Sequence, residues 1–287
     1  MLCVCLAACN EVKDPQPPDV ETIPDQVVAL FEDQFPGAVQ TTIKVVEKDK
    51  IWEAYYSVNA RNFYAALDSN AVLASYQLIS PAVPDSIQTA VSKLAIRGGT
   101  LSDYRCDCDK PTGLPQYYAK YRFQDVDYVL SWTISRSPTQ YVFEMVPYAK
   151  FDFQIETAQK LPANVIRYLN ADNLVFRFGK ISVNESNELK YSVYASSAAS
   201  GDEFIFDSKG AFVFSYYAKE NAYTELKDLP APVRNFIASM PYLTGFRFAS
   251  GAFHHAYHFI LLSERESYTI LLDSNAKLLS LQFNGVI

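Results

Sequence analysis

The chain has 287 residues, enough for one large domain or two of ordinary size, and its 49% hydrophobic and 20% charged residues are typical of globular proteins. The formal net charge of −7 argues against a nucleic-acid partner, because phosphate binding needs clustered lysine and arginine. The sequence has no run of about 18 apolar residues, so it predicts no transmembrane helix.

The N-terminus contains Leu6-Ala7-Ala8-Cys9, which resembles the lipobox of bacterial lipoproteins. Small residues before the cysteine suit a signal peptidase, and the polar segment that follows contains Pro15, Pro17 and Pro18. We therefore expect residues 1–8 to be a lipoprotein signal, Cys9 to carry the lipid, and residues 9–22 to form a tether. This predicts a protein anchored to the outer membrane of the cell envelope, facing the periplasm or the surface. The alternative is a buried apolar strand.

A helix followed by four strands is predicted after this tether. Pro24 suits the first turn of a helix that continues to Phe35, where Pro36-Gly37 stops it. Asp68-Ser69-Asn70 joins the last two strands as a hairpin. The four strand-like runs cover residues 41–47, 51–58, 62–67 and 71–78.

Three further segments show the same order of elements. Their helices are predicted at residues 84–94 and 162–170 and from Pro230 onwards. The second segment is the least regular, because a loop at residues 106–115 splits its first two strands. In the other segments Pro24, Pro162 and Pro230 precede the turn residues Asp68, Asp207 and Asp273 by 44, 45 and 43 residues. Such constant spacing indicates one structural unit that is used repeatedly.

These patterns predict an α+β fold of four tandem units, each a two-layer sandwich of one helix and about four antiparallel strands. One unit of about 60 residues is only marginally stable alone. We therefore expect the units to pair into two domains, residues 23–150 and 151–287, with a boundary within residues 149–159.

The repeated helix, the four strands and the closing hairpin with its Asp-Ser turn, behind a lipobox, resemble the PepSY-like family. This family is also described as β-lactamase-inhibitor-protein-like, and its members are common as lipoproteins in Bacteroides-type bacteria. The resemblance covers residues 23–283 and is weakest in the second unit. It implies a binding or inhibitory fold without catalytic residues, whose open sheet face binds a protein or peptide.

The open face of the sheets can be assigned by alternation along the strands. In the first unit Trp52, Ala54 and Tyr56 are expected to pack against the helix. The side chains predicted on the opposite, open face, in this unit and by the same register in the others, are Glu53, Tyr55, Tyr64, Tyr194, Tyr217, Tyr257 and Phe259. Tyrosine is a favoured interface residue because it is large, rigid and polar at one end. The alternative is that paired units cover this face and bury these aromatics.

Two clusters have the residue types of a metal site but not its spacing. His254, His255 and His258 are predicted on a strand, where residues four apart lie about 13 Å apart. The loop with Cys106 and Cys108 carries aspartates without the spacing of a calcium loop, and zinc needs about four ligands. The two cysteines could form a disulfide or stay reduced. We expect no metal and no cofactor.

The sequence contains no Gly-x-Ser-x-Gly or His-Glu-x-x-His motif. We therefore predict a non-enzymatic, lipid-anchored binding protein that binds or inhibits a protein or peptide. A glycan-binding protein is an alternative, which predicts two or three coplanar exposed aromatics beside Asn, Asp or Arg in a cleft. A structural component of an envelope complex is another. An enzyme would need a deep pocket with convergent carboxylates or histidines.

Overall fold

The computed structural model of the protein describes residues 22–108, 116–136, 139–197, 201–215, 222–253 and 255–286. Cys9, Tyr217 and His254 lie outside these ranges, as do the predicted signal and nearly all of the predicted tether. Within the described ranges the protein contains four α-helices and seventeen strands. The expected α+β class is confirmed at this coarse level, in a protein dominated by strands and by one large antiparallel sheet.

Four groups of elements follow one another along the chain. The first contains α1 (Asp25–Gln34), β1 (Val39–Glu47), β2 (Ile51–Val58), β3 (Arg61–Leu67) and β4 (Val72–Ser80). The second contains α2 (Asp85–Val91), β5 (Thr100–Cys106), β6 (Tyr117–Phe123), β7 (Val126–Arg136) and β8 (Thr139–Pro147). The third contains β9 (Phe151–Ile155), α3 (Ala163–Ala171), β10 (Val175–Val183), β11 (Leu189–Ser196), β12 (Gly201–Phe206) and β13 (Phe212–Ser215). The fourth contains α4 (Ala231–Ala238), β14 (Arg247–Phe253), β15 (Ala256–Leu262), β16 (Glu266–Asp273) and β17 (Leu278–Gly285).

A proline stands immediately before each of these helices, at Pro24, Pro84, Pro162 and Pro230. Its backbone is extended, with a φ of −60° and a ψ of 139° at Pro24. The Pro24 carbonyl accepts the first hydrogen bond of α1, from the N–H of Val27 at 2.9 Å. The prolines therefore mark the helix starts, as expected, but each precedes the first turn instead of lying within it.

The strands form two antiparallel sheets. Twelve strands are ordered β1-β2-β3-β4-β5-β6-β7-β8-β17-β16-β15-β14, and five are ordered β13-β12-β11-β10-β9. Phe143 of β8 pairs with Phe283 of β17, so the larger sheet continues across the predicted boundary at residues 149–159. That boundary segment itself contains β9, a strand that the sequence analysis does not predict.

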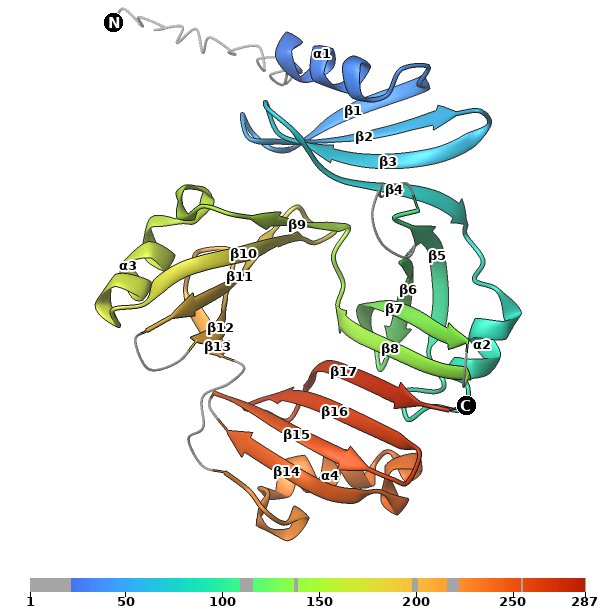
Figure 1. Cartoon of the computed structure of the whole chain (residues 1–287), viewed down its shortest axis with the longest axis vertical. Helices are drawn as coiled ribbons and strands as arrows, with labels where there is room; N and C mark the ends of the chain where they lie inside the picture. Colours follow the sequence, from blue (N-terminus) through green and yellow to red (C-terminus); the bar gives the residue numbers. More distant parts are fainter. Residues whose placement is uncertain are drawn as a thin grey trace, which may run out of the picture.

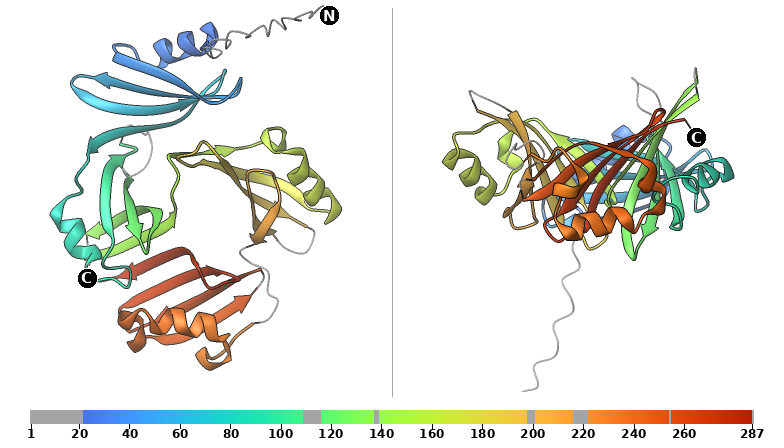
Figure 2. Two further views of the ribbon diagram at one scale, coloured as in Figure 1. Left: turned by 180° about the vertical axis from the view of Figure 1, so that it is seen from behind. Right: turned by 90° about the horizontal axis from the view of Figure 1, so that it is seen from below.

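The helices lie at the periphery of the molecule, and the strands lie between them and its centre (Figures 1 and 2). Side chains of α2 and α4 share one hydrophobic core with β5–β8 and β14–β17. A second core joins β9–β13 to the inner side of β1–β4, and a smaller cluster of Ile205, Phe214, Ala256 and Leu271 joins β12 and β13 to β15 and β16. The four groups are therefore closed into a ring.

In three hairpin turns an aspartate accepts two N–H groups of its own turn. A side-chain oxygen of Asp68 accepts the N–H groups of Asn70 and Ala71, two and three residues on, each at 2.8 Å. Asp207 and Asp273 each accept the N–H groups two and four residues on, at 2.9 and 2.8 Å, so their turns are one residue longer. An aspartate that binds the backbone of its own turn fixes the turn locally, which explains why the sequence predicts these hairpins. No helix among the described residues has the length and apolarity needed to cross a membrane.

Candidate functional site

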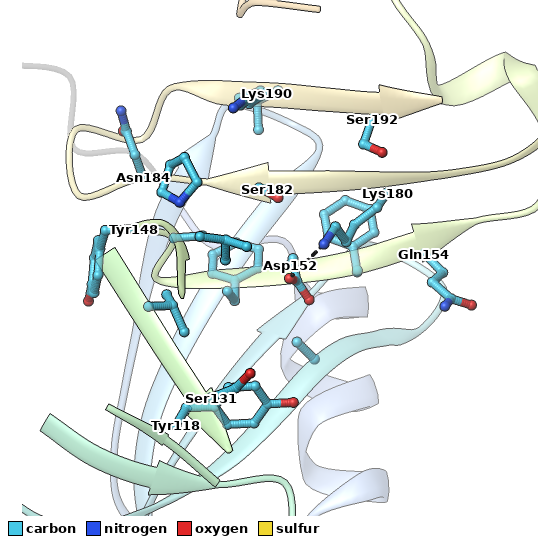
Figure 3. A pocket seen from close by; sticks show the side chains of 18 of the residues that line it. Tyr118, Ser131, Tyr148, Asp152, Gln154, Lys180, Ser182, Asn184, Lys190 and Ser192 are labelled. Carbon is cyan, nitrogen blue, oxygen red and sulfur yellow. Dashed lines mark ion pairs between the residues drawn. The ribbon is translucent and has the colours of Figure 1, made fainter. Parts of the chain in front are cut away.

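The ring encloses a cavity of about 870 Å3 (Figure 3). Its walls come from β4, from β6, β7 and β8, and from the face of β9–β12 that is turned away from α3. A cavity of this size is within the range of ligand-binding pockets in proteins. It is therefore the candidate site of the described structure.

The wall formed by β9, β10 and β11 is polar because polar and apolar residues alternate along these strands. On β10, Ile181 and Val183 are buried, whereas Lys180 and Ser182 face the cavity. Across the sheet, Ser182 pairs with Asp152 on one side and with Lys190 on the other. Lys180 pairs in the same way with Gln154 and Ser192. These six side chains form two adjacent rows on one face (Figure 3).

The charged groups on this wall differ in whether they have a hydrogen-bond or ion-pair partner. The ammonium of Lys180 lies 3.6 Å from the carboxylate of Asp152, and the hydroxyl of Ser192 donates a hydrogen bond to Glu203. Lys190 forms no hydrogen bond or ion pair with the described residues. Burial lowers the pKa of the Lys190 ammonium, and repulsion by Lys180 lowers this pKa further, against the attraction of Glu203.

The facing wall carries a hydrogen-bonded group around Asp107. This carboxylate is 5% exposed and accepts the backbone N–H of Gln116 at 2.7 Å and the hydroxyl of Tyr118 at 3.2 Å. Burial raises the pKa of the Tyr118 hydroxyl, and the neighbouring Tyr76 and Asp107 raise it further. Tyr118 is therefore a neutral hydrogen-bonding group at physiological pH.

Arg105 holds the two walls together. Its guanidinium donates hydrogen bonds to the carbonyl of Lys150 and, at 3.0 Å, to the carbonyl of Ala149, both in the segment between β8 and β9. It also lies 4.8 Å from the ring centroid of Tyr76 on β4, within the range of a cation–π interaction. These contacts fix β9 relative to β4 and β5, and so help to define the cavity.

Glu53 and Tyr64 lie on the face of β2 and β3 opposite α1, as expected, but this face is not open. They are 8% and 4% exposed. The ring of Tyr64 lies 5.8 Å from that of Phe151 on β9, and Glu53 pairs with Lys150 at 2.9 Å. The prediction that both belong to an open interaction face is therefore wrong, because β9 covers them. Tyr55 on the same face remains 38% exposed.

The assignment of Tyr257 and Phe259 to an open face is also wrong. Phe259 is fully buried in the core that includes Val233 of α4, and Tyr257 packs against the same core. Because side chains of a strand alternate between faces, an error of one residue in transferring the register from β2 to β15 exchanges the two faces. The side of β15 that faces away from α4 carries His258 and Ile260, and burial lowers the pKa of His258.

Tyr194 lies on the face of β11 that lines the cavity, as alternation with Ser192 requires. Its ring stacks on Phe178 of β10, with centroids 5.0 Å apart and planes inclined by 15°. Phe178 is 53% exposed. The two rings stack on each other, and they do not form the coplanar platform expected of a glycan site.

Cys106 and Cys108 are joined in a disulfide with their Cα atoms 5.2 Å apart, so neither provides a free thiol. His255 lies immediately before β15, and His258 lies within it. No group of three or more metal-ligating side chains that could hold an ion occurs in the described part of the chain.

The residues of β9–β11 that line the cavity are not among those predicted for the interaction face. A signal for them is present, because Lys180-Ile181-Ser182-Val183 and Lys190-Tyr191-Ser192-Val193 alternate strictly between polar and apolar residues. This pattern predicts a polar face on both strands. It does not show that another part of the chain encloses that face.

A scan against known protein families finds no match for this chain, and no curated protein sequence matches it. Among solved structures, a protein of unknown function from Bacteroides vulgatus that is described as periplasmic aligns with 46% of this chain and 98% of its own. The two are 16% identical, with a TM-score of 0.24. At this score the similarity carries no conclusion about fold or function.

Proposed function

We propose that this protein is a non-enzymatic binding protein of the cell envelope and that its ligand occupies the central cavity. The observation that carries this proposal is the enclosure of a polar sheet face, with charges of both signs, on the side opposite the helices. The Lys180 and Asp152 side chains of this wall are each 45% exposed, and Lys190 has no ion pair with the described residues, so these groups remain accessible to a ligand that pairs with them.

The proposed architecture is four copies of one PepSY-like unit. In support, each of the four α-helices in the described ranges follows a proline and precedes four strands, and in three closing turns an aspartate accepts two N–H groups of its own turn. Anchoring to the outer membrane through a lipid on Cys9 is part of the same proposal and rests on the lipobox. The pairing of units into residues 23–150 and 151–287 stays a prediction.

The partner that we favour is a protein that inserts a peptide segment. The cavity wall offers hydroxyl, amide, ammonium and carboxylate groups, which match the donors and acceptors of a polypeptide. Glycan binding is the second candidate, because the 53% exposed ring of Phe178 offers one stacking surface for a sugar, although Phe178 and Tyr194 together form no coplanar platform. Aromatic side chains at an interface supply large contact areas in either case.

The test is affinity capture from an envelope extract on the immobilised full chain. Ser182→Trp places a bulky ring in the cavity, and Ser186→Trp is the matched control, because Ser186 is exposed in the turn between β10 and β11. We expect a protein to be retained by the wild type and by the control and lost by Ser182→Trp. Retention of polysaccharide alone supports the glycan candidate. Equal retention by all three chains excludes the cavity as the binding site.

A further inference from the structure

Lys190 differs from the other cations that line the cavity. Arg105 donates to two backbone carbonyl groups, and Lys180 pairs with Asp152 at 3.6 Å. Lys190 has no such partner among the described residues, although it is partly buried in the wall. The cavity therefore contains one cation whose hydrogen-bonding capacity is unused.

An ammonium group removed from water without a partner is costly, and proteins rarely retain one without a compensating contact. The charged groups that face Lys190 compensate its charge only in part, because Glu203 attracts the ammonium without forming an ion pair with it. Lys180 on β10 repels it, Asp152 on β9 is engaged by Lys180, and Glu203 on β12 already accepts the hydroxyl of Ser192. Binding of an anionic group would supply the missing contact.

The surroundings of Lys190 also provide a second hydrogen-bond donor. Ser182 pairs with Lys190 across the sheet, and its hydroxyl has no hydrogen-bond partner among the described residues. Lys180 lies two residues before Ser182 on the same face of β10. An anion beside Lys190 would therefore meet its ammonium and the Ser182 hydroxyl, and the ammonium of Lys180, which is directed to Asp152 on β9, would add a longer-range attraction (Figure 3).

The charges of the residues that line the cavity favour a ligand with one negative charge over a ligand with two. The phosphate group of a phosphorylated ligand carries a charge of about −1.5 to −2 at neutral pH, whereas a carboxylate carries one negative charge. Among the described residues that line the cavity, Lys190 is the only cation without an ion pair or hydrogen bond, and the carboxylates of the wall would repel a dianion more strongly than a monoanion. These carboxylates are Asp107, Glu144, Asp152, Glu188, Glu203 and Asp207.

We propose that Lys190, with Lys180 and Ser182, binds a carboxylate of the peptide segment that enters the cavity. This inference rests on the proposed function, because it names the chemical group that the same cavity recognises. The carboxylate is that of an aspartate or glutamate side chain, or of a C-terminus.

The test is a titration of the full chain with two tripeptides whose termini are blocked and uncharged, acetyl-Ala-Glu-Ala-amide and acetyl-Ala-Gln-Ala-amide. Binding is monitored by NMR of 13C-dimethylated lysines. Dimethylation keeps the positive charge of lysine. We expect the glutamate peptide to shift the Lys190 resonance and to bind at least about tenfold more tightly than the glutamine peptide, as a hydrogen bond to a charged group provides. It should also raise the pH midpoint of Lys190, since an opposite charge stabilises the ammonium.

Lys190→Met should abolish the preference for glutamate, and Lys180→Met should reduce it. Lys93→Met is the matched control, because Lys93 is exposed after α2, and it should leave the preference unchanged. Equal binding of both peptides, absence of binding, or a preference that survives Lys190→Met would overturn the inference. Tighter binding of inorganic phosphate would replace carboxylate by phosphate as the ligand. The proposed function is judged separately, by the capture experiment with Ser182→Trp.

Discussion

The ammonium of Lys150 lies 2.9 Å from the carboxylate of Glu53, and this ion pair joins β2 to the segment that leads into β9. The side chains are 14% and 10% exposed, so the pair is largely desolvated. Lys150 also donates to Asn187 at 2.7 Å, and the Tyr64 hydroxyl donates to Glu53 at 3.3 Å. The pair thus lies at the contact that covers the inner face of β1–β4.

Lys150→Met should lower the free energy of unfolding by about 3–5 kcal/mol, because it leaves the buried Glu53 carboxylate without its cation. The double variant Glu53→Gln/Lys150→Met should recover part of this loss. Lys50→Met is the control, since Lys50 is 68% exposed beside Glu47 and should change stability by about 1 kcal/mol or less. Urea unfolding midpoints measure these differences, and equal losses for Lys150→Met and Lys50→Met would contradict the role of the buried pair.

Arg105→Lys should destabilise the protein by about 1.5–3 kcal/mol, because lysine cannot donate to both backbone carbonyl groups and stack on Tyr76. The matched control is Arg122→Lys, since the Arg122 side chain is 57% exposed and forms only surface ion pairs among the described residues. Thermal unfolding of both variants tests this. A similar loss in both would show that the contacts of Arg105 contribute little.

Phe259→Ala should lower the free energy of unfolding by about 3–5 kcal/mol, the usual result of removing a buried aromatic side chain. Tyr55→Ala should have a smaller effect, of about 1 kcal/mol, because Tyr55 is 38% exposed. Chemical denaturation compares the two. The opposite ranking would show that β15 presents Phe259 to solvent.

Asp68 should make stability dependent on acid pH. Burial by itself would raise its pKa, but hydrogen bonds from Lys160, Asn70 and Ala71 outweigh this effect and hold the pKa below the ordinary value of 3.8. The contribution of ionised Asp68 to the free energy of unfolding is therefore complete above pH 3.8 and is lost as the pH falls through the lower pKa of the folded state. Asp68→Asn keeps the side-chain oxygen of the turn and should remove this pH dependence. Unfolding curves measured at decreasing pH, starting at about pH 5, roughly one unit above the ordinary aspartate pKa, test this prediction.

Lys190→Met should stabilise the unliganded protein at neutral pH by about 1 kcal/mol, because it removes a partly buried ammonium that has no hydrogen bond or ion pair with the described residues. The lowered pKa means that the unfolded chain binds more protons between the folded pKa and 10.5, so wild-type stability should rise with pH across that window. The variant should lack this contribution. A variant less stable than the wild type would show that Lys190 has a stabilising partner.

Several features of the fold were predictable because they depend on neighbouring residues. The helix starts follow from the fixed backbone of Pro24 and its counterparts, and the hairpins follow from aspartates such as Asp68 that bind their own turns. Alternation placed Glu53 and Tyr64 correctly on the side of the sheet opposite α1. The same reasoning failed for Phe259, because a period of two residues does not tolerate a shift of one.

The sequence by itself determined the order of the helices and of the strands other than β9, and the closing turns, and it contains the alternation that gives β10 and β11 a polar face, because these depend on backbone preferences and local periodicity. Only the tertiary structure decided what lies against each face. The Tyr128 hydroxyl donates to the carbonyl of Leu278, 150 residues away, and β9 covers Glu53 and Tyr64. Such contacts depend on how distant apolar surfaces bury one another, and no local pattern specifies which of several similar faces is covered and which encloses a cavity.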